Sequence, residues 1–183
     1  MSMHDKKQEH TTHLLGASLV GKTHPRIELR GCIDSLRAEL VELQAKALHE
    51  GRADLKKDLD EVALALQELQ AAEVRDSSCA ELALWGLNEA EIHERSHFPE
   101  RYFGLGHILA HPDMGIWASA LNRLRARVRE TELCACRAFE KGEETERPDI
   151  IKNLNRLSSA LYILIYKYLP KGYDKLASFA RKA

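Results

Sequence analysis

Apolar residues recur along this chain in steps of three and four, the spacing that places them on one face of an α-helix. Four such stripes lie within residues 33–47, 55–69, 117–138 and 150–168. Polar and charged residues fill the positions between them, as on the outer face of a packed helix. The pattern predicts four long amphipathic helices that bury their apolar faces against one another.

Helix-ending residues support these limits. Gly51 and Gly142 follow two of the stripes, Pro148 suits the first turn of the last helix, and Pro170 stops it. Between the second and third stripes, Asn88 followed by Glu91 resembles a capping box and predicts a short helix over residues 89–97. The fold class we predict is all-α, a five-helix bundle of four long helices and one short one.

The chain divides into three segments by pattern. Residues 1–25 are polar and show no helical or strand period, so we expect an irregular N-terminal segment that a ligand or partner orders. Residues 26–169 form the helical domain. Residues 170–183 form a short basic tail.

Composition excludes several classes of protein. The 27 Lys and Arg residues against 28 Asp and Glu give a net charge of -1, which provides no field for nucleic acid or an anionic membrane. The longest apolar run is short, residues 160–166, and residues 1–10 contain no signal-peptide core. Four scattered cysteines do not make a disulfide framework. We expect a cytoplasmic protein that binds neither nucleic acid nor membrane.

Polar residues border the apolar stripes of the last two long helices. Arg125, Arg129 and Glu132 share one face beside the stripe, where Glu132 could simply pair with Arg129 on a solvated surface. Asn155 and Ser159 have the same layout in the last helix, together with Tyr162. An asparagine beside a core stripe is costly unless it bonds a partner.

Three pairs of residues have spacings that invite comparison with metal or redox motifs. His93 to His97 matches H-E-x-x-H, the zinc-protease motif, but no third spaced histidine follows. Glu94 and His97 also match half of a di-iron site, but the sequence contains no second Glu-x-x-His. His107 and His111 are also four residues apart, which leaves a four-histidine site open. Cys134 and Cys136 point to different sides of a helix, so buried packing is the expected role for one of them. We predict no metal site.

Several motifs occur in the order found in the ATP:corrinoid adenosyltransferases, which this sequence resembles over roughly residues 11–166. Those shared with the wider family lie at residues 11–16, 22, 25–28, 31–34, 120–125, 129, 132 and 155–159. Those that resemble the ethanolamine-utilization type lie at residues 93, 96–97, 99–102, 127–132 and 147–150.

The resemblance implies an enzyme that transfers the 5′-deoxyadenosyl group of ATP to the cobalt of reduced cobalamin and makes adenosylcobalamin. Co(I) is the nucleophile and triphosphate leaves, so the cofactors are ATP with Mg²⁺, and cobalamin as substrate. Arg125 and Arg129 would stabilise the leaving triphosphate, because the forked donors of arginine match phosphate. Asp34 would pair with Arg125. The ATP-binding residues implied are Thr11, Thr12, Lys22, Arg26, Glu132 and Asn155.

Reduction of cobalt requires loss of an axial donor, which the family achieves by placing apolar side chains under the corrin. The irregular stretch 98–112 is the expected place, with Phe103, Ile108 and Leu109 as candidates. A histidine that bound cobalt from below would oppose this mechanism.

Three departures from the family pattern stand out. Residues 6–10 contain no glycine where many members have a glycine-rich, phosphate-binding strip. We therefore expect the contacts with triphosphate to shift toward Lys and Arg side chains. No cysteine precedes Cys32, so the Cys-rich metal motif of some members is not expected. Ser159 replaces the Asp that usually closes the last motif.

The resemblance also implies a homo-oligomer, most often a trimer, with the active site between subunits, a reductase partner, and a location in the cytoplasm or a bacterial microcompartment. The alternative is a corrinoid- or ATP-binding sensor or escort protein that kept the fold and lost turnover. A third hypothesis is a helical interaction module without ligands.

Overall fold

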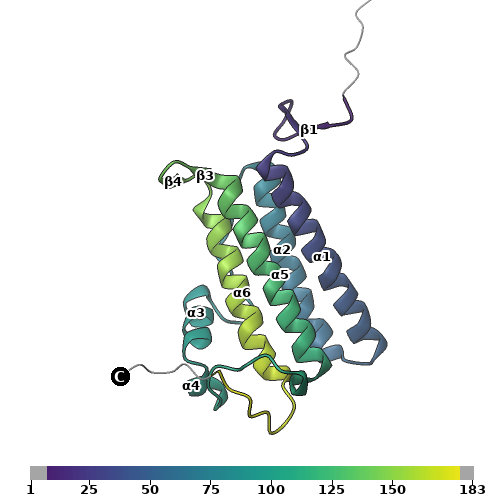
Figure 1. Ribbon diagram of the computed structural model, residues 1–183, viewed down its shortest axis with the longest axis vertical. Coiled ribbons are helices and arrows are strands. Elements are labelled where there is room, and N and C mark those ends of the chain that lie inside the picture. Colours follow the sequence, from purple (N-terminus) through teal and green to yellow (C-terminus); the bar gives the residue numbers. More distant parts are fainter. Residues whose placement is uncertain (1–7, 178–183) are drawn as a thin grey trace, which may run out of the picture.

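Four long helices lie side by side in the computed structural model, which describes residues 8–177 (Figure 1). They are α1 (Pro25–His49), α2 (Ala53–Arg75), α5 (Gly115–Phe139) and α6 (Pro148–Tyr168). Helix α5 packs against both α1 and α6, and α1 also packs against α2. The beginning of the N-terminal segment (1–7) and the end of the basic tail (178–183) lie outside the described residues.

The predicted stripes form the core of this bundle. Leu36 and Leu40 of α1, Leu59 of α2, Leu121 of α5 and Leu161 of α6 are all at most 1% exposed. Their burial removes apolar surface from water, the main favourable contribution to folding. The all-α prediction is confirmed. No helix among residues 8–177 has the length and apolar character needed to cross a membrane.

The short helix α3 (Glu89–His97) has the bounds that its capping box predicts. The Asn88 side chain accepts a hydrogen bond from the Glu91 backbone N–H at 3.0 Å, and the Glu91 carboxylate accepts one from the Asn88 N–H at 2.9 Å. A second short helix, α4 (Pro99–Phe103), follows at once, with Pro99 in its first turn. Proline stops one helix but suits the start of the next, which the sequence alone did not separate. A 3₁₀ turn, η1 (Pro112–Met114), precedes α5.

Two small hairpins accompany the helices, and the first lies in the N-terminal segment for which irregular structure was expected. Strand β1 (Thr11–His13) pairs antiparallel with β2 (Leu19–Gly21), with Thr12 opposite Val20. Strand β3 (Glu140–Lys141) pairs with β4 (Glu144–Thr145) between α5 and α6. Strands of two or three residues are too short for a period-2 pattern to stand out in a sequence.

The chain after α6 returns along the loop that joins α4 to η1. The Leu109 N–H donates to the Lys175 carbonyl at 3.0 Å, and the Ala177 N–H donates to the His107 carbonyl at 2.8 Å. Tyr173 adds a hydrogen bond from its hydroxyl to the Leu109 carbonyl. The described part of the expected tail is therefore packed against this loop.

Candidate active site

The predicted polar faces of α5 and α6 meet in one cleft, with α3 as its third wall. The cleft has a volume of about 190 Å³ and takes Arg125 and Arg129 from α5 and Ser96 from α3. Helix α6 contributes Ser158, Ser159 and Tyr162. Helical spacing is the reason, because positions that border the core stripe on each helix face the same groove when the helices pack.

The two arginines of the cleft have no carboxylate partner among the described residues. The Arg125 Nε donates to the Asn122 amide oxygen at 3.1 Å, and its guanidinium lies 5.9 Å from the centre of the Tyr162 ring. Burial, and then the charge of Arg129, lower the pKa of Arg125. Arg129 is exposed, and its guanidinium makes no ion pair within residues 8–177. Two adjacent positive charges without a counterion favour an anionic ligand.

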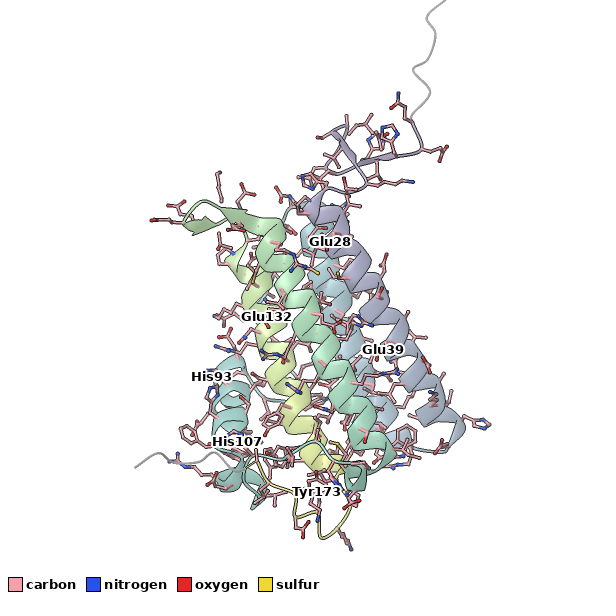
Figure 2. The ribbon with its side chains drawn as sticks, in the orientation of Figure 1. Glu28, Glu39, His93, His107, Glu132 and Tyr173 are labelled. Carbon is pink, nitrogen blue, oxygen red and sulfur yellow. The ribbon has the colours of Figure 1, made fainter. Side chains whose placement is uncertain are left out.

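Glu132 pairs with the neighbouring helix and not with Arg129, so the solvated-face interpretation is wrong on this point. Its carboxylate accepts a hydrogen bond from the Asn155 amide at 2.9 Å (Glu132 in Figure 2). The Asn155 oxygen accepts one from Arg156 Nη1 at 2.8 Å. Glu132 and Asn155, both expected to bind ATP, thus lie together between α5 and α6.

Arg156 is a residue that the sequence reasoning did not select. Its Nε is buried and has no hydrogen-bond partner in the described structure, and it lies 3.6 Å from the Glu89 carboxylate. Its place directly after Asn155 in the same motif was the available signal. A buried N–H donor without a hydrogen bond is unusual in a folded protein, so Arg156 joins the candidate residues.

The residues expected to bind ATP at the N-terminus lie far from this cleft within one chain. Thr11 and Thr12 are on β1 and the exposed Lys22 follows β2, in a hairpin that stands beyond the end of α1 (Figure 1). The Thr11 hydroxyl donates to the Gln8 carbonyl at 2.8 Å. A single chain therefore does not bring the hairpin and the arginines together.

Asp34 does not pair with Arg125, which corrects the expectation for a single chain. The Asp34 carboxylate accepts a hydrogen bond from the Gln70 amide of α2 at 3.1 Å. Arg125 instead lies against Tyr162 of α6. Asp34 therefore contacts α2, whereas Arg125 contacts α6.

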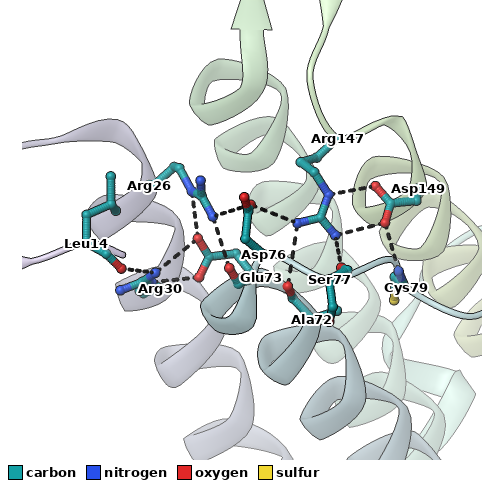
Figure 3. A network of polar contacts seen from close by, with 10 residues as sticks. All are labelled: Leu14, Arg26, Arg30, Ala72, Glu73, Asp76, Ser77, Cys79, Arg147 and Asp149. Atoms are coloured by element: carbon teal, nitrogen blue, oxygen red, sulfur yellow. Dashed lines mark hydrogen bonds and ion pairs between the residues drawn. The ribbon is translucent and has the colours of Figure 1, made fainter. Parts of the chain in front are cut away.

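Arg26, also expected to bind ATP, is engaged by protein partners (Figure 3). Its Nε donates to the Glu73 carboxylate at 2.8 Å and its Nη2 to the Glu73 carbonyl at 2.9 Å. Asp76 lies 3.4 Å from the same nitrogen, and the guanidinium is 5.4 Å from the centre of the Phe139 ring. The side chain is buried, so its direct role here is to hold α1 against α2.

The apolar candidates for the corrin surface have different surroundings. Phe103 stacks on Tyr166 with ring centres 4.7 Å apart, and the half-buried Ile108 pairs with Leu176. Leu109 is 51% exposed. Leu109 is thus the most exposed of the three.

The histidines make local contacts. The rings of His93 and His97 lie 4.1 Å apart, and His97 Nδ1 is 3.0 Å from the His93 carbonyl oxygen. His107 Nδ1 is 3.1 Å from the Tyr162 hydroxyl (Figure 2). His111 accepts from the Asp113 N–H at 3.3 Å. Within residues 8–177, no three His, Cys, Asp or Glu side chains gather in a metal-binding arrangement.

Comparisons with known proteins agree on one family. The sequence matches the family described as "Cobalamin adenosyltransferase" over residues 3–168. "Corrinoid adenosyltransferase EutT" of Salmonella typhimurium is 36% identical over 161 residues, and the protein of that description in Escherichia coli K12 is 34% identical over 164. Each match covers 87% of this chain and 59% of the relative. The chain therefore spans about 59% of the length of these relatives.

A solved structure shares the fold. It is a variant PduO-type ATP:corrinoid adenosyltransferase from Lactobacillus reuteri, complexed with cobalamin and ATP. The TM-score is 0.69 at 18% sequence identity, and the match covers 92% of this chain and 94% of that chain.

Proposed function

Because the chain belongs to the cobalamin adenosyltransferase family, we propose that it is an ATP:cob(I)alamin adenosyltransferase that acts in ethanolamine utilization. The observation that carries this proposal is the cleft between α5 and α6, where Arg125 and Arg129 make no ion pair with a carboxylate of the described residues. Glu132 and Asn155 lie between the same two helices, hydrogen-bonded to each other. The names of the relatives and the shared fold support it.

The proposed reaction requires little covalent chemistry from the protein. The electron pair of Co(I) attacks C5′ of ATP, a cobalt–carbon bond forms, and the bond between C5′ and the triphosphate oxygen breaks with its electrons on that oxygen. The nucleophile belongs to the substrate, so the side chains have to position C5′ and stabilise the leaving charge.

Arg125 and Arg129 suit the second task. Charge that develops on the triphosphate is stabilised by donors already in place, in a partly water-excluded site. Arginine also offers paired N–H donors that match phosphate oxygens. Mg²⁺ is expected to enter on the phosphates of ATP, where it neutralises part of their charge.

Glu132 and Asn155 suit the nucleoside part of ATP. Their side chains bond to each other at 2.9 Å, so a ribose hydroxyl or an adenine nitrogen could replace this contact at little cost in hydrogen bonds. Ser159 replaces the family's Asp, so we expect a neutral contact at this point of the cleft.

The loop before η1 suits the lower face of the corrin. Leu109 is exposed, and the half-buried Phe103 is stacked on Tyr166. The contact between His107 and the Tyr162 hydroxyl holds that ring toward the protein. An apolar surface at this place would exclude an axial donor and ease reduction of cobalt.

We further propose a homo-oligomer, a trimer by family resemblance, with the active site between subunits. The hairpin with Thr11, Thr12 and Lys22 lies beyond the end of its own bundle. Asp34 bonds Gln70 and not its own Arg125, which lies against Tyr162. A neighbouring copy would bring these residues to the arginine cleft. A reductase that supplies the electron, and the cytoplasm or a microcompartment as the location, complete the proposal.

The test is an anaerobic assay of the purified chain with ATP, Mg²⁺ and chemically reduced cobalamin, followed by the visible spectrum of light-sensitive adenosylcobalamin. We expect product from the wild type and a loss of about 10²–10³-fold in rate for Arg125→Ala. Arg127→Ala is the matched control, because Arg127 lies on the same helix but pairs with Glu130 at 2.6 Å.

Two results would change the conclusion. Binding of ATP and corrinoid without product would favour the sensor or escort protein. Equal rates for Arg125→Ala and Arg127→Ala would remove the cleft from the mechanism.

A further inference from the structure

Two cysteines from different helices meet inside the bundle, away from the arginine cleft. Cys32 of α1 and Cys134 of α5 have their sulfur atoms 2.8 Å apart. Cys134 is 7% exposed and Cys32 is half-buried. A disulfide has an S–S bond of about 2.05 Å, so its formation would bring the two atoms closer by roughly 0.8 Å.

Charged neighbours give the two thiols different properties. Arg137 Nη2 donates to the Cys134 sulfur at 3.2 Å, and the same guanidinium lies 3.7 Å from the Glu28 carboxylate. A cationic donor stabilises negative charge on sulfur, the form that attacks an oxidant. Burial, and then the contact with Cys134, raise the pKa of Cys32 to about 11. The Arg137 contact favours Cys134 as the sulfur that reacts first, with Cys32 positioned to follow.

We propose that Cys32 and Cys134 are a peroxide-sensitive pair that forms a reversible disulfide between α1 and α5. The Cys134 sulfur attacks one oxygen of hydrogen peroxide, the O–O bond breaks, and a water leaves after the released hydroxide takes the thiol proton. The Cys32 sulfur then attacks the resulting sulfenic acid, and its own proton leaves with the hydroxyl group as a second water. Two thiols lose two electrons, and one peroxide becomes two waters.

The other cysteines lack this arrangement in the part of the chain that the structure describes. Cys136 is exposed and Cys79 is half-buried beside Asp149, and neither lies against another thiol. Cys136 can react with peroxide, but it has no neighbour within its own chain to form a disulfide. The inference concerns the two thiols alone and does not depend on the proposed activity.

The disulfide would change stability measurably. It would join positions 102 residues apart in sequence, and closure of a loop of this length restricts the unfolded chain strongly. For a protein of this size we expect oxidation to raise Tm by roughly 10 °C. Disulfides in reducing compartments are mostly transient and redox-sensing, which fits a reversible bond.

The experiment uses the full chain with Cys136→Ser, which removes the exposed thiol. The protein is treated with a small excess of hydrogen peroxide, free thiols are blocked with N-ethylmaleimide, and a digest without reductant is analysed by mass spectrometry. We expect one linked pair of peptides that contain Cys32 and Cys134, an alkylated Cys79, the rise in Tm, and full reversal by dithiothreitol.

Two further variants complete the test. Adding Cys32→Ser should abolish the link and the rise in Tm and leave Cys134 as a sulfenic acid that dimedone traps. Adding Cys79→Ser should change nothing. Alkylated Cys32 and Cys134 after peroxide treatment, or a Cys134 oxidised beyond the sulfenic acid while Cys32 stays a free thiol, would overturn the proposal.

Discussion

Two groups of arginines in this chain have opposite surroundings. At the hairpin end of the bundle, Arg26 and Arg30 share the buried Glu73, and Arg147 pairs with Asp149 at 2.8 Å (Figure 3). In the cleft between α5 and α6, Arg125 and Arg129 have no carboxylate among the described residues.

The difference distinguishes arginines that stabilise the fold from arginines that are available to bind a ligand. A buried arginine costs free energy unless its charge is paired, and the hairpin end supplies that pairing within the chain. The cleft leaves its charges unpaired and partly desolvated, an arrangement that an incoming anion improves. The structural and the ligand-binding roles can therefore be separated by substitution.

The largest effect on stability is expected from Glu73, the carboxylate shared by two arginines. Glu73→Gln removes the charge that balances Arg26 and Arg30, whose Nε atoms lie 2.8 and 2.6 Å from it. Breaking a buried ion pair from one side costs about 3–5 kcal/mol. Urea unfolding measures this loss, and a change below about 1 kcal/mol would mean that the network contributes little.

A large effect on activity, with little on stability, is expected from Arg129. Arg129→Ala should lower kcat/KM by about 10²-fold, a contribution of roughly 2.7 kcal/mol to the transition state. Arg129→Lys should have an intermediate kcat/KM, since lysine keeps the positive charge but lacks the paired N–H donors of arginine. The urea midpoints of both variants should match the wild type, and a parallel loss of stability would make Arg129 a structural residue.

A smaller, pH-dependent effect is expected from Asp149 at the hairpin end. The hydrogen bonds from Arg147 lower the pKa of Asp149 to about 2. A carboxyl with a lowered pKa stabilises the fold above its unfolded pKa near 4, and the benefit disappears as the pH falls toward 2.

Asp149→Asn should therefore cost on the order of 1 kcal/mol at pH 7, because partial exposure screens the pair. The difference from wild type should vanish near pH 2. Unfolding curves between pH 7 and 2 measure it, and a difference that persists at the acid end would assign the cost to packing.

The smallest effect is expected from the capping box of α3, the third wall of the cleft. Asn88→Ala removes the side-chain acceptor of the Glu91 N–H and should cost about 0.5–1 kcal/mol. Hydrogen exchange should rise in α3 and stay unchanged in α5. Unchanged protection in α3 would show that its packing on α6 holds it without the cap.

The sequence predicted the helices well because their signal is local and repeated. The stripe from Leu55 to Leu69 and the capping box at Asn88 each specify an element from residues close in the chain. The hairpin at Thr11–Gly21 was not predicted, because strands of three residues contain too few alternations of apolar and polar residues to be recognised.

The two arginine groups could not be separated from the sequence. Arg26 begins the first predicted helix and Arg125 borders the apolar stripe of a later one, and both lie in segments that resemble family motifs. What separates them is Glu73, which lies 47 residues from Arg26 and reaches it only when α1 packs on α2. The partner of Glu132 was misjudged for the same reason, because Asn155 lies on another helix 23 residues away.

The central claim is that the unpaired arginines of α5 hold a triphosphate. The most direct measurement is calorimetric titration of inorganic triphosphate into the wild type, the double variant Arg125→Ala/Arg129→Ala and the control Arg127→Ala. We predict that the wild type and the control bind triphosphate with affinities that agree within about twofold. The double variant should bind it at least about 100-fold more weakly, since charge-assisted hydrogen bonds are worth about 1.5–3 kcal/mol each. Equal affinity in all three proteins would contradict it.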